Sequence, residues 1–205
     1  MEHFILDTNV FFNLEAKMGL GDNPKEIFLS FSHFAKGFLH SKKAAFYMPP
    51  KIVDELYTFI EPDTEYLKSF LSLIHVASPD IPAHQFPASI FYQFVQESRE
   101  RAYRGMQVAE ELIDQTAKDM MGKDLSGIEY QKQVGEHIKR LRDRYRTATR
   151  VNFLDSVADL DLIVLTKQLG GTLLSTDEGV LRFGRAFGIK EVMPSQVKER
   201  LESLL

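Results

Sequence analysis

Cysteine is absent from the 205-residue chain, and long apolar runs are absent too. Without cysteine there can be no disulfide, no thiol nucleophile and no zinc site built from thiolates. No segment approaches the roughly 20 apolar residues needed to cross a bilayer. The N-terminus carries Glu2 before a short apolar run and lacks the basic segment of a signal peptide. We therefore expect a cytoplasmic protein that uses neither thiol chemistry nor a membrane.

An excess of positive charge is also lacking, since the formal net charge is −4. This argues against a uniformly basic nucleic-acid binder. Basic residues are nevertheless concentrated in one segment, 139–150, which contains a single acid, Asp143. The segment holds Lys139, Arg140, Arg142, Arg144, Arg146 and Arg150. A basic segment separate from a group of acids suits a metal-dependent nuclease, in which carboxylates hold the cation and the basic segment holds phosphate.

Short apolar runs alternate with segments of helical spacing along most of the chain. The predicted strands cover 4–6, 45–48, 172–175 and 191–193, and the predicted helices cover 24–40, 51–60, 64–74, 153–169, 178–187 and 195–205. This alternation predicts an α/β fold with a parallel sheet flanked by helices on both faces.

Residues 88–149 interrupt this pattern with two long, polar, helix-forming segments. A turn between Gly122 and Gly127 separates them, so we expect a helical hairpin inserted into a body made of residues 1–87 and 150–205. The second helix has a narrow apolar seam at Val134, Ile138, Leu141 and Tyr145, of coiled-coil width. We expect this seam to pair with the same seam on another copy of the chain.

Four aspartates are the candidate catalytic residues. Asp7 and Asp177 each follow a predicted strand, and ligands of open α/β sheets bind at the carboxyl ends of the strands. Asp155 and Asp159 are four residues apart on one predicted helix, which places them on one face with about 5–6 Å between their β-carbons. Taken alone, each acid is explained more simply by a surface or capping role without chemistry. Asp177, for example, could N-cap the helix that follows it.

Like charges one helical turn apart favour a bound cation. Oxygen ligands with no histidine or cysteine nearby suit Mg²⁺ or Mn²⁺ and not zinc. Such an ion can activate water and neutralise charge on a phosphodiester. The combination of carboxylates therefore indicates metal-dependent phosphodiester hydrolysis.

Four cations recur on one face of the second hairpin helix, apart from the apolar seam. Lys139, Arg142, Arg146 and Arg150 are spaced 3, 4 and 4 residues apart. A row of cations one turn apart can contact successive phosphates without reading bases. The alternative is an ordinary solvent-exposed helix face, where charged residues are common.

The motifs around these acids resemble those of the PIN nuclease domain. Leu6-Asp7-Thr8-Asn9 after an apolar strand is similar to the opening of that domain, as is Asp159 followed 18 residues later by Asp177. The resemblance places the family's second acid at Glu55 and matches Asp155 to the acid one turn before Asp159. Asp161 departs from the small residues expected there and is a further candidate ligand or supporting residue. We expect Thr8 and Asn9 to orient Asp7 by hydrogen bonds.

The inserted hairpin is similar to that of the HARP family, the minimal protein-only ribonuclease P enzymes. The segments 4–13, 47–56 and 154–161 strengthen this likeness. The resemblance implies that the chain removes the 5′ leader from precursor tRNA without an RNA subunit. It also implies assembly into homo-oligomers through the hairpins.

Three other functions share some of these sequence features. A toxin-type PIN ribonuclease of different RNA specificity and a non-catalytic oligomeric RNA-binding module both remain open. A haloacid-dehalogenase-like phosphatase needs a second acid two residues after the first, and the chain has Asn9 at that position.

Overall fold

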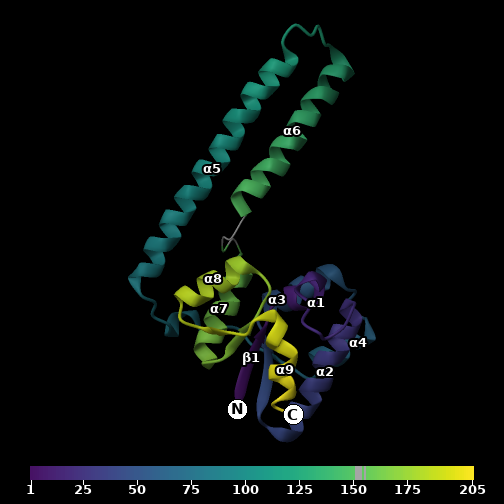
Figure 1. The fold of residues 1–205 in the computed structure, drawn as a ribbon, viewed down its shortest axis with the longest axis vertical. Coiled ribbons are helices and arrows are strands. Elements are labelled where there is room, and N and C mark those ends of the chain that lie inside the picture. The colour runs from purple at the N-terminus through teal and green to yellow at the C-terminus, as the bar shows by residue number, and fades with distance from the viewer. Residues whose placement is uncertain (151–153, 155) are drawn as a thin grey trace. The chain divides into compact units, whose positions relative to one another are not determined.

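The computed structural model describes residues 1–150, 154 and 156–205, with only the backbone of Arg150. The chain divides into two compact units (Figure 1). The first unit, residues 1–86 and 154–205, is called the body, and the second, residues 87–153, is called the hairpin. No helix among the described residues is both long enough and apolar enough to cross a membrane.

The body contains a five-stranded sheet in the order β3-β2-β1-β4-β5, and every neighbouring pair is parallel. The strands are β1 (Glu2–Leu6), β2 (Ala44–Met48), β3 (His75–Val76), β4 (Thr172–Leu174) and β5 (Lys190–Glu191). The central strand β1 is fully buried at Phe4, Ile5 and Leu6, as expected for a parallel strand covered on both faces.

Helices connect the strands of the body. They are α1 (Asn9–Phe12), α2 (Pro24–Ser41), α3 (Pro50–Phe59), α4 (Glu65–Leu71), α7 (Val157–Leu169), α8 (Glu178–Ala186) and α9 (Val197–Glu202), with short 3-10 helices at Leu14–Ala16, Ile81–Ala83 and Pro194–Gln196. The predicted α/β class with a parallel sheet and flanking helices is confirmed.

The order of the strands reverses between β1 and β4. The chain runs outward from β1 to β2 and β3, then returns to place β4 on the other side of β1. Right-handed crossovers then put α2 and α7 on opposite faces of the sheet. At the return, Gly170 ends α7 in the left-handed conformation with φ +57°, and a β-carbon at Gly171 would lie only 2.6 Å from the carbonyl oxygen of His3.

Buried phenylalanines hold α1 and α2 in the body. The Phe11 ring stacks on Phe28 with centroids 4.0 Å apart, and it also contacts Phe31 and Phe70. All four side chains are buried. Because α1 begins two residues after Asp7, this packing also fixes the segment that follows β1.

Several elements differ from the sequence prediction, among them α1, which was not predicted, and β5, which covers Lys190–Glu191 where 191–193 was expected. Strand β3 was not predicted, because it is only two residues long and both are exposed. The helix predicted from residue 153 instead begins at Val157. Ser156 has extended backbone angles, and its hydroxyl oxygen accepts a hydrogen bond from the Ala158 N–H at 3.0 Å, so it is an N-cap.

The hairpin consists of α5 (Ala88–Met120) and α6 (Gly127–Arg150), seen in teal and green in Figure 1. The helices pack closely at Gly105, where a β-carbon would lie 2.6 Å from the Tyr145 ring. Arg144 forms an ion pair with Glu111 across the pair, and Arg104 Nε donates to the Ala148 carbonyl at 2.9 Å.

The apolar seam of α6 faces α5 of the same chain. Val134 and Leu141 line a hollow of about 340 Å³ together with Leu112 of α5, and Tyr145 packs over Gly105. Part of the seam stays open, since Ile138 is 43% and Tyr145 is 47% exposed, so its expected pairing with another copy of the chain stays a prediction.

Candidate active site

Asp7 and Asp177 follow the two strands that meet at the reversal of strand order. Asp7 comes directly after β1, and its N–H donates to the Leu174 carbonyl of β4 at 3.0 Å. Asp177 lies three residues beyond the end of β4. The crevice at such a switch point is where open α/β sheets bind ligands. The fold therefore places both acids at the expected binding edge.

Asp7 is a buried carboxylate with three hydrogen-bond donors. Its side chain is 2% exposed. The Ser175 hydroxyl and the Asn9 amide (3.3 Å) donate to Oδ2, and the Asn9 N–H donates to Oδ1 at 3.4 Å. Burial raises the pKa of Asp7 to about 6; the hydrogen bonds oppose this rise, and the charge of Glu55 adds slightly to it. Asp7 is thus ionised at neutral pH in surroundings that disfavour its charge.

Glu55 comes to the same edge on α3. The first turns of α3 lie there because the helix starts at Pro50, directly after β2. The Thr8 hydroxyl donates to Glu55 Oε2 at 3.0 Å. Thr8 was expected to orient Asp7, but the structure gives its hydroxyl to Glu55, whereas Asn9 does bind Asp7.

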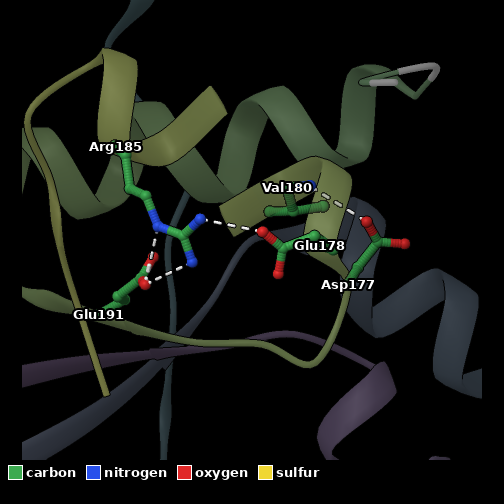
Figure 2. Close-up of polar contacts among 5 residues, drawn as sticks. All are labelled: Asp177, Glu178, Val180, Arg185 and Glu191. Atoms are coloured by element: carbon green, nitrogen blue, oxygen red, sulfur yellow. Dashed lines mark hydrogen bonds and ion pairs between the residues drawn. The ribbon is translucent and has the colours of Figure 1, made fainter. Parts of the chain in front are cut away.

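Asp177 caps α8. Its Oδ1 accepts from the Val180 N–H at 3.0 Å, and Figure 2 shows the second carboxylate oxygen turned away from Val180. The helix is tied to β5 by Arg185, which binds Glu178 at 2.9 Å and Glu191 at 2.8 Å (Figure 2). Both acids raise the pKa of Arg185. Capping uses one oxygen of Asp177, so the capping role does not exclude a second role for the other.

Ser175 joins the two aspartates and was missed by the sequence analysis. It is buried, its hydroxyl donates to Asp7, and the same oxygen accepts from the Asp177 N–H at 3.0 Å. The signal available in the sequence was its position, directly after β4 and two residues before Asp177. A small hydroxyl there can reach both neighbours at the end of the strand.

The acids near the start of α7 differ in burial and in contacts. Asp159 lies in the first turn and is half-buried, whereas Asp155 lies outside the described residues. The predicted placement of Asp155 and Asp159 on one face of a helix therefore stays a prediction. Asp161 is buried, and its Oδ2 lies 2.7 Å from Lys51 Nζ in the first turn of α3. This ion pair accounts for Asp161 and brings the start of α7 to the edge where α3 begins.

The donor chemistry of the edge fits a hard divalent cation, since every candidate ligand is a carboxylate oxygen. The buried charge of Asp7, held close to Glu55, is the specific observation that favours one. Among residues 1–150, 154 and 156–205, no three histidine, aspartate or glutamate side chains form a group that could hold a metal ion.

The predicted cation row lies on α6 of the hairpin. Lys139, Arg142 and Arg146 are exposed, and none of them forms an ion pair with another described residue. Arg142 and Arg146 border a hollow of about 540 Å³ on the hairpin surface, with Tyr145 beside them. The side chain of Arg150 lies outside the described part of the chain.

Residues 3–205 match the family described as PINc domain ribonuclease. The chain is also similar over its whole length to proteins named RNA-free ribonuclease P. It is 33% identical to the one from Thermodesulfovibrio yellowstonii over 201 residues, covering 98% of this chain and 94% of the relative. It is 32% identical to those of Pyrococcus horikoshii (100% and 94% covered) and Alkalilimnicola ehrlichii (100% and 98% covered).

Proposed function

The chain belongs to the PIN-domain ribonucleases and, within them, to the RNA-free ribonuclease P family, and from this we propose that it removes the 5′ leader from precursor tRNA as a metal-dependent endonuclease without an RNA subunit. The name shared by the relatives favours this function over a toxin-type ribonuclease and over a non-catalytic RNA-binding module. The structural observation that carries the proposal is Asp7, a buried carboxylate at the switch point of the sheet.

Five acids would hold a Mg²⁺ or Mn²⁺ ion: Asp7, Glu55, Asp159, Asp177 and Asp155. When bound, such an ion lowers the pKa of water and neutralises the charge that develops on a phosphodiester during hydrolysis.

The neighbouring side chains keep two of these acids in place. Ser175 and Asn9 fix the direction of the Asp7 carboxylate, and the Thr8 hydroxyl fixes one oxygen of Glu55. Two acids that are already oriented have less to rearrange when the cation and substrate arrive.

Cleavage of labelled precursor tRNA tests the function. With Mg²⁺, the purified protein should release the leader at the mature 5′ end, and EDTA should stop the reaction. Asp7→Ala and Asp177→Ala should each remove most activity while leaving a folded protein by circular dichroism. Asp54→Ala is the matched control, because Asp54 is an exposed acid next to Glu55 in sequence. Full activity in both site variants, or activity that survives EDTA, would refute the mechanism.

The cation row of α6 would bind the body of the tRNA. Each phosphate contact adds a little under one unit to the slope of log affinity against log salt. The double variant Arg142→Ala/Arg146→Ala should therefore raise KM and flatten the salt dependence at nearly unchanged kcat. Arg140→Ala, on another side of the helix, is the control. Unchanged KM and salt slope in the double variant would make this row a solvated face.

The hairpin would also assemble copies of the chain, through exposed residues of α5 as well as the open part of the α6 seam. Exposed apolar residues recur along α5 at roughly heptad spacing: Tyr92, Val95, Tyr103, Met106 and Ile113. A second helix can cover such a stripe. Light scattering should show an oligomer that becomes smaller in Met106→Lys/Ile113→Lys but not in Ile128→Lys, a control on α6. A monomeric wild-type protein would contradict this assembly.

A further inference from the structure

Two successive contacts join α1 and α3 beside the acidic edge. The first is the hydrogen bond from Thr8 to Glu55, and the second is a ring contact between Phe12 and Phe59, with centroids 4.6 Å apart and planes inclined by 31°. Phe12 follows Thr8 by four residues, about one helical turn, and Phe59 follows Glu55 by the same number. The aromatic pair therefore lies one turn from Glu55, the acid whose charge acts on Asp7.

The Phe59 ring is held in place without being buried. Its side chain is 58% exposed at the last residue of α3. Phe12 is half-buried, and its ring also contacts Phe28 edge-on, with 6.4 Å between the ring centroids. This contact connects the pair to the phenylalanine core. The core itself is filled by fully buried rings. Phe59 differs from these core rings, because much of its ring surface faces solvent. A ligand can cover this surface.

We propose that the Phe12–Phe59 pair is a stacking platform for one unpaired nucleobase of the RNA next to the scissile phosphate. The proposal rests on the proposed ribonuclease function and adds a substrate contact to it. Proteins recognise single-stranded RNA by stacking unpaired bases on aromatic side chains. The 5′ leader supplies such bases at the cleavage site, and the exposed surface of one ring matches the face of one base.

Stacking of this kind is sequence-tolerant, because every base has an aromatic face. The platform therefore selects an unpaired nucleotide and not a particular base. A base stacked on Phe59 would lie about one helical turn from Glu55, and the adjoining phosphate of the same strand would be carried toward the acids. Phe59 is thus a substrate-binding residue that determines which nucleotide conformation reaches the site.

The test combines variants with modified substrates. Phe59→Ala should lower kcat/KM for precursor tRNA by roughly tenfold, within a range of about 5- to 150-fold for the loss of one stacked base. Phe59→Tyr keeps the ring and should retain wild-type activity. Tyr57→Ala is the matched control, since Tyr57 is an exposed aromatic residue of the same helix that lies about 200° around it. Circular dichroism should show all three variants folded.

Abasic nucleotides locate the partner of the ring. A series of precursors carries one abasic nucleotide each, at successive positions around the junction. At one position, wild type should cleave the abasic precursor roughly tenfold less efficiently than the unmodified precursor. Phe59→Ala should cleave these two precursors with equal efficiency. Equal losses for wild type and Phe59→Ala at every position would overturn the platform, as would wild-type kcat/KM in Phe59→Ala.

A binding measurement separates this inference from the proposed function. Leaders carrying 2-aminopurine at that position should lose fluorescence on binding wild-type protein in EDTA, and binding to Phe59→Ala should leave the fluorescence largely unchanged. Failure of wild type to cut at the mature 5′ end would contradict the ribonuclease P function alone. Equal quenching by wild type and Phe59→Ala would refute the platform whatever the cleavage result.

Discussion

Asp7→Asn should stabilise the protein at neutral pH in the absence of divalent cations. Burial raises the pKa of Asp7 from 3.8 to about 6 in the folded state. A raised pKa means that the fold prefers the protonated carboxyl, so the associated stability is fully present below pH 3.8 and is lost as pH rises through about 6. At pH 7.5 the ionised side chain therefore works against folding, and an uncharged amide of the same shape does not.

The size of the effect follows from the pKa change. One pKa unit is worth about 1.4 kcal/mol, so the difference between 3.8 and about 6 corresponds to about 3 kcal/mol. The amide oxygen can keep the bonds from Ser175 and the Asn9 side chain, but the amide nitrogen then faces the Asn9 N–H, at a cost of about 1 kcal/mol. The net gain of about 2 kcal/mol should raise Tm by about 4–8 °C in a chain of this length.

Urea unfolding followed by circular dichroism, with EDTA present, measures this gain. Asp7→Asn should exceed wild type at pH 7.5. At pH 4 the gain should disappear and turn into a small loss, because the contribution of the pKa change falls to about 0.6 kcal/mol while the amide's cost of about 1 kcal/mol remains. Added Mg²⁺ should narrow the gap by stabilising wild type alone. Asp54→Asn controls for the loss of one negative charge at an exposed position. A variant no more stable than wild type at pH 7.5, or a gain independent of pH, would refute the reasoning.

Three further substitutions test other contacts. Ser175→Ala removes the donor to the buried carboxylate and should lower single-turnover cleavage by roughly 10–100-fold at unchanged fold; a wild-type rate would make the hydroxyl dispensable. Lys51→Ala leaves the buried Asp161 carboxylate without its cation and should lower the free energy of unfolding, measured by urea titration, by about 1–2 kcal/mol. Adding Asp161→Asn should largely reverse this loss. Gly105→Ala forces a methyl group into the facing tyrosine ring and should destabilise the hairpin by about 1–3 kcal/mol in thermal melts, whereas Gly135→Ala, with open space around it, should stabilise it slightly.

The fold could be predicted from the sequence where burial is periodic. The apolar run of β1 and the alternation of strands and helices were sufficient for the α/β class, because both faces of the sheet are covered. The start of α7 could not be predicted in this way. Phe153 and Leu154 extend the apolar pattern backwards, but the hydroxyl of Ser156 caps the helix and its extended backbone ends the pattern.

The candidate site was predictable where a residue's role follows from its own strand. Asp7 and Asp177 follow strands, so the topology alone brings them to one edge. Ser175 and Lys51 were missed because their partners are 168 and 110 residues away in the sequence. Such contacts depend on how α3, α7 and β4 pack together, which no local pattern encodes.

The order of the sheet has a consequence for synthesis of the chain on the ribosome. β1 lies between β2 and β4, but β4 begins only at Thr172, after the whole hairpin. At about 5–20 residues per second, one side of β1 stays unpaired for roughly 6 to 25 s after Met48 has been made. During that interval β1 is an edge strand open to wrong pairing. Because Ser175 and Asp177 follow β4, the nascent chain carries an incomplete acidic site until nearly all of it has been translated.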